Sequence, residues 1–211
     1  MHIPDGFLNP EMCAITAAIV APYAAYAFYK TRAIPKEKRA IIPVLASAIF
    51  AAQMLNWPIV GGTSLHFVGG ALSGMLLGPW GGFTTMFLVL LVQCLVFHDG
   101  GITTLGANLL NMAVIDVLVG YAVYRLAPEK YKGVGAFLGA WAGITLAGVA
   151  AGVELGLSSY MPYGLSVTLP VMGFWHALLG IIEGLITMGV YSYLKSRAPY
   201  MLAGAAGGGV A

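Results

Sequence analysis

The chain has 211 residues, of which 59% are hydrophobic and only 9% are charged. An ordinary soluble domain carries about 25% charged residues, so this composition excludes a soluble globular protein. Its formal net charge is +2. Without a dense basic face, that charge also excludes nucleic-acid binding, which needs clustered Lys and Arg to neutralise phosphates. The surface of the protein is therefore expected to face lipid.

Hydrophobic runs bounded by Gly, Pro and charged residues predict an all-α polytopic membrane protein with about seven transmembrane helices. In chain order, the predicted helices cover residues 11–29, 40–57, 65–78, 82–97, 105–126, 134–156 and 170–194.

The third predicted helix, 65–78, is short. At 1.5 Å per residue, about 14 residues reach only about 21 Å, less than the ~30 Å hydrocarbon core. This helix therefore either starts inside the membrane or is half of a broken span completed by the next helix. Non-helical backbone is tolerated at that depth only where protein or a cavity covers it. Residues 58–64 are accordingly predicted to form a loop folded into the protein.

All ten Lys and Arg residues fall in three clusters, at 30–39, 125–132 and 195–197. Seven crossings would place the three clusters on one face. Because basic loops stay in the cytoplasm, the N-terminus is predicted to lie outside and the C-terminus inside. Residues 1–197 are expected to form a single transmembrane domain, followed by a flexible low-complexity tail at 198–211.

Glycines recur four residues apart in two sets in the predicted helix 134–156. They stand at Gly135, Gly139 and Gly143, and then at Gly148, Gly152 and Gly156. Small residues at this spacing let two helix backbones approach closely. The stripe is predicted to pack inside this chain, and the alternative is a docking surface for another membrane subunit.

The N-terminus itself carries the pattern of a metal chelate. The α-amine of Met1, the amide nitrogen of His2 and the His2 Nδ1 atom are spaced to close a five-membered and a six-membered ring on one ion. A fourth nitrogen would complete a square-planar site, which favours Ni(II) or Cu(II) over Zn(II). His66 is the first choice for the fourth nitrogen, because it begins the short helix beside the predicted buried loop. His98 is the next.

Four polar residues are candidates for a supporting shell around this site. His98 and Asp99 end a predicted helix and would either orient a ligand or cap the helix. Asn108 and Asn111 share a helix face and would hold the N-terminal segment, line the site or link helices.

Further polar residues lie inside predicted spans. Asp116 and Glu183 are intramembrane acids, which are costly and therefore suggest a function. His176 lies two helical turns before Glu183, so the two are predicted to share one internal stripe. Glu154 is predicted to be interfacial.

Several separated motifs resemble the CbiM/NikM family, the membrane substrate-capture (S) components of energy-coupling-factor (ECF) importers for cobalt and nickel. They are Met-His-Ile-Pro-Asp-Gly-Phe-Leu at 1–8, Gly-Gly-Thr-Ser-Leu-His at 61–66, Leu-Leu-Gly-Pro-Trp at 76–80, His-Asp-Gly-Gly-Ile-Thr-Thr-Leu-Gly-Ala-Asn at 98–108 and Asn-Met at 111–112. The resemblance runs from Met1 to about Gly120.

This resemblance implies a helical protein of the prokaryotic plasma membrane with its N-terminus tucked into the bundle. It implies Met1, His2 and His66 as metal ligands. Residues 67–70, Phe-Val-Gly-Gly, depart from the Pro-Thr-Gly-Thr associated with many cobalt members. Nickel is therefore weakly favoured as the substrate.

The expected function is thus a nickel-capturing component of an uptake transporter rather than an enzyme. The resemblance implies a transmembrane coupling (T) subunit and a pair of ABC ATPases as partners, with a small accessory membrane subunit as a further candidate. The chain contains no Gly-x-x-x-x-Gly-Lys-[Ser/Thr] loop, so no ATP is expected to bind to it. The alternatives are a cobalt-specific S component for cobalamin synthesis and a stand-alone secondary metal transporter or channel.

Overall fold

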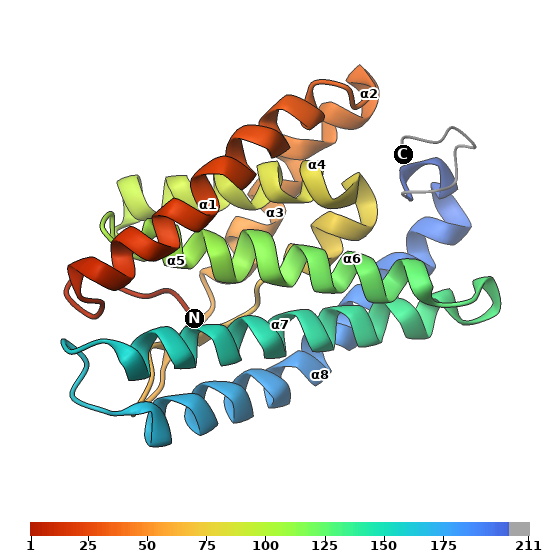
Figure 1. The fold of residues 1–211 in the computed structure, drawn as a ribbon. Helices are drawn as coiled ribbons and strands as arrows, with labels where there is room; N and C mark the ends of the chain where they lie inside the picture. The colour runs from red at the N-terminus through yellow and green to blue at the C-terminus, as the bar shows by residue number, and fades with distance from the viewer. Residues whose placement is uncertain (203–211) are drawn as a thin grey trace.

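The computed structural model describes residues 1–202, and these form a bundle of helices with one small β-hairpin (Figure 1). The principal elements are α1 (Pro10–Thr31), α2 (Lys36–Arg39), α3 (Ile41–Gln53), β1 (Asn56–Pro58), β2 (Ser64–His66), α4 (Gly70–Val92), α5 (Leu105–Leu109), α6 (Asp116–Leu126), α7 (Lys132–Leu157) and α8 (Leu165–Arg197). Two π-helical segments extend these helices: Gln93–Phe97 follows α4, and Leu110–Ile115 joins α5 to α6.

Within the described residues, five helices are long and apolar enough to cross a membrane. They cover Pro10–Thr31, Gly70–Phe97, Leu105–Leu126, Glu129–Leu157 and Leu165–Arg197. The prediction of an all-α polytopic membrane protein is therefore confirmed. The exact number of spans stays a prediction.

The predicted helix 65–78 is wrong over its first five residues. Ser64–His66 instead pairs antiparallel with Asn56–Pro58, with His66 opposite Asn56. Gly69 then adopts a left-handed conformation with φ 77°, which an L side chain rarely adopts, and α4 begins at the next residue. The strand forms because Ser64–His66 pairs with Asn56–Pro58, a partner outside the predicted helix.

Helix α4 is broken at Gly78, where φ is 72° and ψ is 177°. The Oγ atom of Ser73 donates a hydrogen bond to the carbonyl oxygen of Gly82 at 3.3 Å. In a continuous helix, two residues nine apart would be separated by about 13 Å along the axis. The chain therefore folds back on itself at Gly78, and α4 consists of two arms. This agrees with the broken span that was one of the two interpretations of the short helix.

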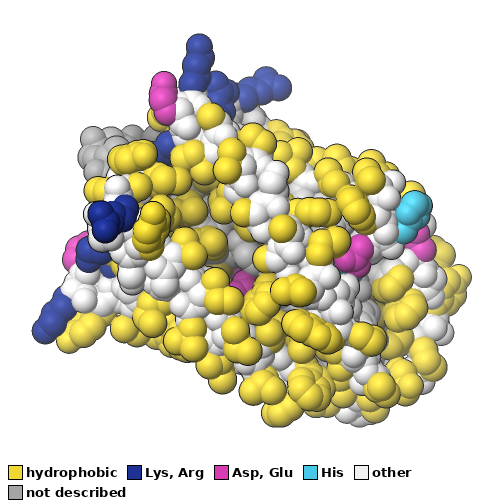
Figure 2. Space-filling view, turned by 180° about the vertical axis from the view of Figure 1, so that it is seen from behind, with side chains coloured by type: hydrophobic (Ala, Val, Ile, Leu, Met, Phe, Trp, Pro, Cys, Tyr) yellow, Lys and Arg dark blue, Asp and Glu magenta, His cyan; other side chains and the backbone are white. Residues whose placement is uncertain are grey.

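The basic residues gather at one end of the molecule, as Figure 2 shows. Exposed apolar side chains cover most of the surface between the two ends in this view. Such a surface suits a lipid environment. The clustering agrees with the orientation derived from the basic loops, while the sidedness of the two termini stays a prediction.

The glycine stripe of α7 packs inside this chain. A Cβ atom on Gly139 would lie 2.7 Å from the carbonyl oxygen of Gly120 in α6, and one on Gly152 would lie 2.9 Å from the carbonyl oxygen of Thr168 in α8. Both distances are too short for a real Cβ contact. The stripe thus brings three helix backbones together, and intramolecular packing is confirmed over a docking surface.

This close packing gives a stability prediction. Replacing Gly139 by Leu should destabilise the folded protein by about 1–3 kcal/mol, because the new side chain must displace the backbone of α6. Gly189→Leu is the matched control, since no heavy atom lies within 4 Å of a Cβ at that position. Thermal unfolding in detergent checks the pair. Equal melting temperatures for the two variants would contradict the packing account.

The predicted tail begins with ordered structure. Residues Pro199–Met201 form a 3₁₀ turn and Leu202 is buried. The remainder of the predicted tail, 203–211, lies outside the described residues.

Candidate metal centre

The first residues of the chain are buried in the middle of the bundle rather than at its surface (Figure 1). Met1 and Ile3 are fully buried. The backbone N–H of Ile3 donates to Asn108 Oδ1 at 2.8 Å, and its carbonyl oxygen accepts from Asn108 Nδ2 at 3.1 Å. Gly101 also donates to that carbonyl. The tucked N-terminus is therefore confirmed, and Asn108 is one residue that holds it.

A second anchor lies at Asp5. Its carboxylate accepts hydrogen bonds from the backbone N–H groups of Ile102 and Thr103 at 3.1 and 2.8 Å, and from the Thr103 hydroxyl. The hydroxyl first, and then the backbone groups, lower the pKa of Asp5 below its usual value. A side chain at Gly101 would collide with this carboxylate. The loop before α5 is thus shaped to grip the N-terminal segment.

His2 and His66 stack on each other inside the protein. Their ring centroids are 4.3 Å apart and the ring planes differ by 18°. His2 is 3% exposed and His66 is fully buried. Segments 64 residues apart in the chain are therefore brought together at the N-terminus, as the candidate ligand set requires.

The hydrogen bonds of the two rings indicate which nitrogens have free lone pairs. The Nδ1 atom of His66 lies 2.7 Å from the Phe67 carbonyl oxygen, which can only accept, so Nδ1 carries the proton. The Nε2 atom of His2 lies 3.1 Å from Gln93 Oε1, so in this ring Nε2 carries the proton. The opposite nitrogens, His66 Nε2 and His2 Nδ1, are buried with no hydrogen-bond partner among the described residues. Both lone pairs are available to a metal ion.

The Met1 amine completes this group of nitrogens, and it donates a hydrogen bond to Ser64 Oγ at 3.0 Å. Burial lowers the pKa of the amine well below its usual value of 8.0. Burial, and next the nearby amine, lower the pKa of His2 to about 3. Burial likewise lowers the pKa of His66, and charges on the amine, His2 and His176 lower it further. These lower pKa values favour the uncharged nitrogens, which is the form that binds metals.

Asp99 lies beside this group. Its Oδ1 atom is 3.4 Å from His2 Nδ1. Because His2 is uncharged at neutral pH, this approach is not an ion pair there. Burial raises the pKa of Asp99 above its usual value. Asp99 is thus a predicted supporting residue that lies beside a ligand atom.

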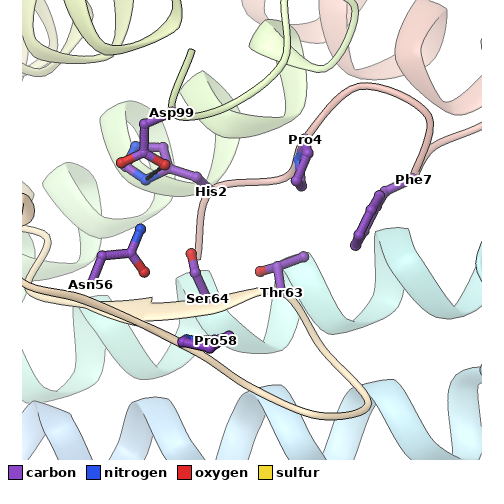
Figure 3. A pocket seen from close by; sticks show the side chains of 8 residues that line it. All are labelled: His2, Pro4, Phe7, Asn56, Pro58, Thr63, Ser64 and Asp99. Atoms are coloured by element: carbon purple, nitrogen blue, oxygen red, sulfur yellow. Dashed lines mark ion pairs between the residues drawn. The ribbon is translucent and has the colours of Figure 1, made fainter. Parts of the chain in front are cut away.

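A pocket of about 420 Å³ opens over His2 (Figure 3). Its walls come from the N-terminal segment, the β-hairpin and the loop after α4, and the lining residues are His2, Pro4, Phe7, Asn56, Pro58, Thr63, Ser64 and Asp99. In Figure 3, the side chains of His2 and Asp99 lie side by side at one end of the pocket. Of the candidate ligand residues, His2 lines this pocket, together with four residues that carry side-chain oxygen atoms: Asn56, Thr63, Ser64 and Asp99.

Two buried carboxylates fix the backbone that follows His66. Glu183 of α8 accepts hydrogen bonds from the N–H groups of Val68 and Gly69 at 2.9 and 2.8 Å. Asp116 of α6 accepts from the N–H of Ala71 at 3.2 Å. These N–H groups lie at the start of α4, where a helix lacks internal acceptors and its dipole favours negative charge. The two intramembrane acids therefore position the loop that carries His66.

Two other predicted residues do not join this group. His98 is exposed and holds a left-handed backbone with φ 55° at a helix end, apart from the ligand nitrogens. Asn111 instead donates to Glu154 Oε2 at 2.7 Å and links two helices. Glu154 lies near the end of α7, where it is only 5% exposed and is held inside the bundle by Asn111, and its place at the membrane interface stays a prediction.

Three site residues were missed from the sequence: Ser64, Gln93 and Gln53. Ser64 and Gln93 contact the amine and His2, and Gln53 Nε2 donates to the Val68 carbonyl at 2.6 Å. Both Gln residues lie in apolar runs. An uncharged polar side chain in a predicted span could have indicated them.

Residues 1–202 contain no group of three His, Cys, Asp or Glu side chains arranged to hold a metal ion. The candidate centre differs in kind, since two of its four nitrogens belong to the main chain. A search for side-chain ligands alone would overlook it.

Comparison with known proteins identifies the chain's relatives. Residues 2–201 match the family model for CbiM, described as the cobalt uptake substrate-specific transmembrane region. The chain belongs to the CbiM family. It is 53% identical over 199 residues to a putative fused nickel transport protein NikMN of Archaeoglobus fulgidus, covering 94% of this chain and 67% of the relative. It is 36% identical to the fused nickel transport protein NikMN of Rhodobacter capsulatus, covering 96% of this chain and 64% of the relative.

The fold of this CbiM-family chain matches a solved structure described as a truncated transition metal transporter. The TM-score is 0.90 at 38% identity, over 93% of this chain and 99% of the other. With its apolar helices, the chain is therefore a multi-pass membrane protein of a transport family and not an enzyme.

Proposed function

We propose that this CbiM-family chain captures Ni(II) for an uptake transporter at a planar site of four nitrogens. The ligands are the Met1 amine, the His2 amide nitrogen, His2 Nδ1 and His66 Nε2. The observation that carries the proposal is the pair of buried imidazole lone pairs on His2 and His66, both without partners in residues 1–202 and next to a buried amine.

The chemistry of this donor set favours nickel. Four nitrogens in a plane suit Ni(II) or Cu(II) better than metals that prefer tetrahedral sites. Relatives named as nickel transport proteins reach 53% identity to this chain, whereas a relative named as a cobalt transport protein, from Sorangium cellulosum, is 30% identical. Both facts support Ni(II) as the substrate, with Co(II) second.

Energy for transport is proposed to come from separate proteins: a transmembrane coupling subunit and a pair of ABC ATPases of the ECF type. The absence of a phosphate-binding loop from the printed sequence supports this division of labour. Fused relatives exceed this chain in length, which supports a further membrane component as a partner.

Titration of the purified, untagged protein with Ni(II) tests the proposed ligand set. The expected product is a yellow, diamagnetic complex with one ion per chain, typical of planar nitrogen ligation. An octahedral Ni(II) spectrum would contradict the planar site. His98→Ala is the matched control, since this exposed histidine lies apart from the ligands and its loss should leave the spectrum and affinity unchanged.

Transport assays separate this proposal from a stand-alone transporter. Vesicles containing this chain alone should not accumulate Ni(II), whereas vesicles that also contain the coupling and ATPase subunits should do so when ATP is supplied. ATP-independent uptake by the chain alone would favour the stand-alone alternative.

A further inference from the structure

The proposed site leaves one buried histidine unused. His176 of α8 is fully buried, and its Nδ1 atom lies 2.7 Å from the carbonyl oxygen of Met172. That carbonyl can only accept, so Nδ1 carries the proton and Nε2 keeps its lone pair. The Nε2 atom has no hydrogen-bond partner within residues 1–202. A buried polar atom without a partner is costly, so its retention calls for an explanation.

His176 lies on the face of α8 that packs against the His66 segment. Met172 and Glu183 are four residues before and seven after it, so all three share one helix face. A Cβ on Gly62 would meet the Met172 sulfur, and Glu183 binds the backbone of 68–69. Residues 62–69 therefore run along this face of α8.

His66 lies within that stretch, between the two contacts. Strand β2, which ends at His66, also contacts α8 directly. Two buried imidazoles, each with a free Nε2 lone pair, thus belong to facing segments.

The packing of α7 makes room for this histidine. A Cβ on Gly148 would lie 2.5 Å from His176 Cγ, so only glycine lets the ring lie against α7. The ring is thereby held inside the bundle. Helix α8 starts at Leu165 and ends in the basic segment at Arg197. His176 lies one helical turn after Met172, the residue of α8 that Gly62 approaches.

We propose that His176 Nε2 is the next ligand of the metal ion and takes the place of His66 when the ion leaves the planar site. This inference rests on the proposed function. In the exchange, the Nε2 lone pair of His176 forms a bond to Ni(II) and the bond from His66 Nε2 breaks. Both imidazoles are neutral before and after, so no proton or electron is transferred.

Four forms of the full chain test the exchange: the unmodified protein, His66→Ala, His176→Ala and the double variant. Equilibrium Ni(II) affinity is measured by competition with a chelator. His176→Ala alone should bind as the unmodified protein does, because His66 fills the fourth position. His66→Ala should bind about tenfold or more weakly, and the double variant about tenfold more weakly again, since His176 no longer substitutes.

Three outcomes would overturn the inference. If the double variant binds as His66→Ala does, His176 does not take over the position. If His176→Ala alone loses tight binding, His176 is a resident ligand or a structural residue. If His66→Ala binds normally, the planar site itself is wrong, and the inference falls with the proposed function.

A spectroscopic test distinguishes ligation from an effect on folding. In the His66→Ala background, His176→Cys loaded with Co(II) should show a thiolate-to-metal charge-transfer band. Thr187→Cys is the matched control, because Thr187 is also buried on α8 but lies beyond Glu183. Absence of the band at position 176, or an equal band in the control, would overturn direct ligation.

Discussion

Acetylation of the Met1 amine is expected to weaken Ni(II) binding by more than about 100-fold, equivalent to more than about 2.8 kcal/mol. Acetylation turns the amine into an amide, whose nitrogen lone pair is delocalised into the carbonyl, so the nitrogen no longer binds as a free amine does. Met1 is also fully buried and its amine donates to Ser64, so an added group must displace this contact. Competition titration of the acetylated and free proteins measures the difference.

A removable extension supplies the control for this experiment. One residue placed ahead of Met1 should have the same effect as acetylation, and protease removal of a longer leader that restores Met1 as the terminus should restore binding. Thermal unfolding in detergent verifies that the bundle remains folded. Tight Ni(II) binding by the extended, folded protein would refute the amine as a ligand.

Loss of the Glu183 carboxylate is expected to have the second large effect. Glu183→Ala leaves the N–H groups of Val68 and Gly69 without their acceptor in a buried place. Each unsatisfied buried group costs about 1–3 kcal/mol, so about 2–6 kcal/mol of folding stability should be lost. Ni(II) affinity should fall as well, because the released loop carries His66.

Two further substitutions of carboxylates isolate the cause. Glu183→Gln keeps one side-chain acceptor oxygen and should be intermediate in both stability and affinity. Glu37→Ala removes an exposed carboxylate from α2 and should change neither. Melting temperature and chelator competition are measured for all three. A Glu183→Ala protein as stable as the Glu37 variant would refute the positioning role.

The helices could be predicted because their signal is local. A long apolar run needs no distant partner to indicate a span, and the break at Gly78 and Pro79 is marked by the two residues themselves. Residues 65–69 could not be assigned in this way. Their strand depends on pairing with Asn56–Pro58, and their loop depends on a carboxylate more than 100 residues away.

The candidate site also combines local features, which could be predicted, with long-range contacts, which could not. The spacing of Met1 and His2 is a property of adjacent residues, so a chelate could be predicted from it. The contacts of Ser64 and Gln93 with this terminus link residues 63 and 91 positions apart. Such contacts exist only in the folded bundle. Polar residues inside apolar runs signal that a partner exists, without indicating which one.

The docking of the N-terminus has a consequence for biogenesis. The first residues to be synthesised depend on partners made much later, since Ile3 is held by Asn108 and Phe7 by Ser158, 105 and 151 positions along the chain. Long loops of this kind are entropically costly to close. Docking of the N-terminal segment therefore cannot be completed before these partners have been made. On the proposed function, the metal site would exist only in the finished bundle, and a chain stalled during synthesis would not retain the ion there.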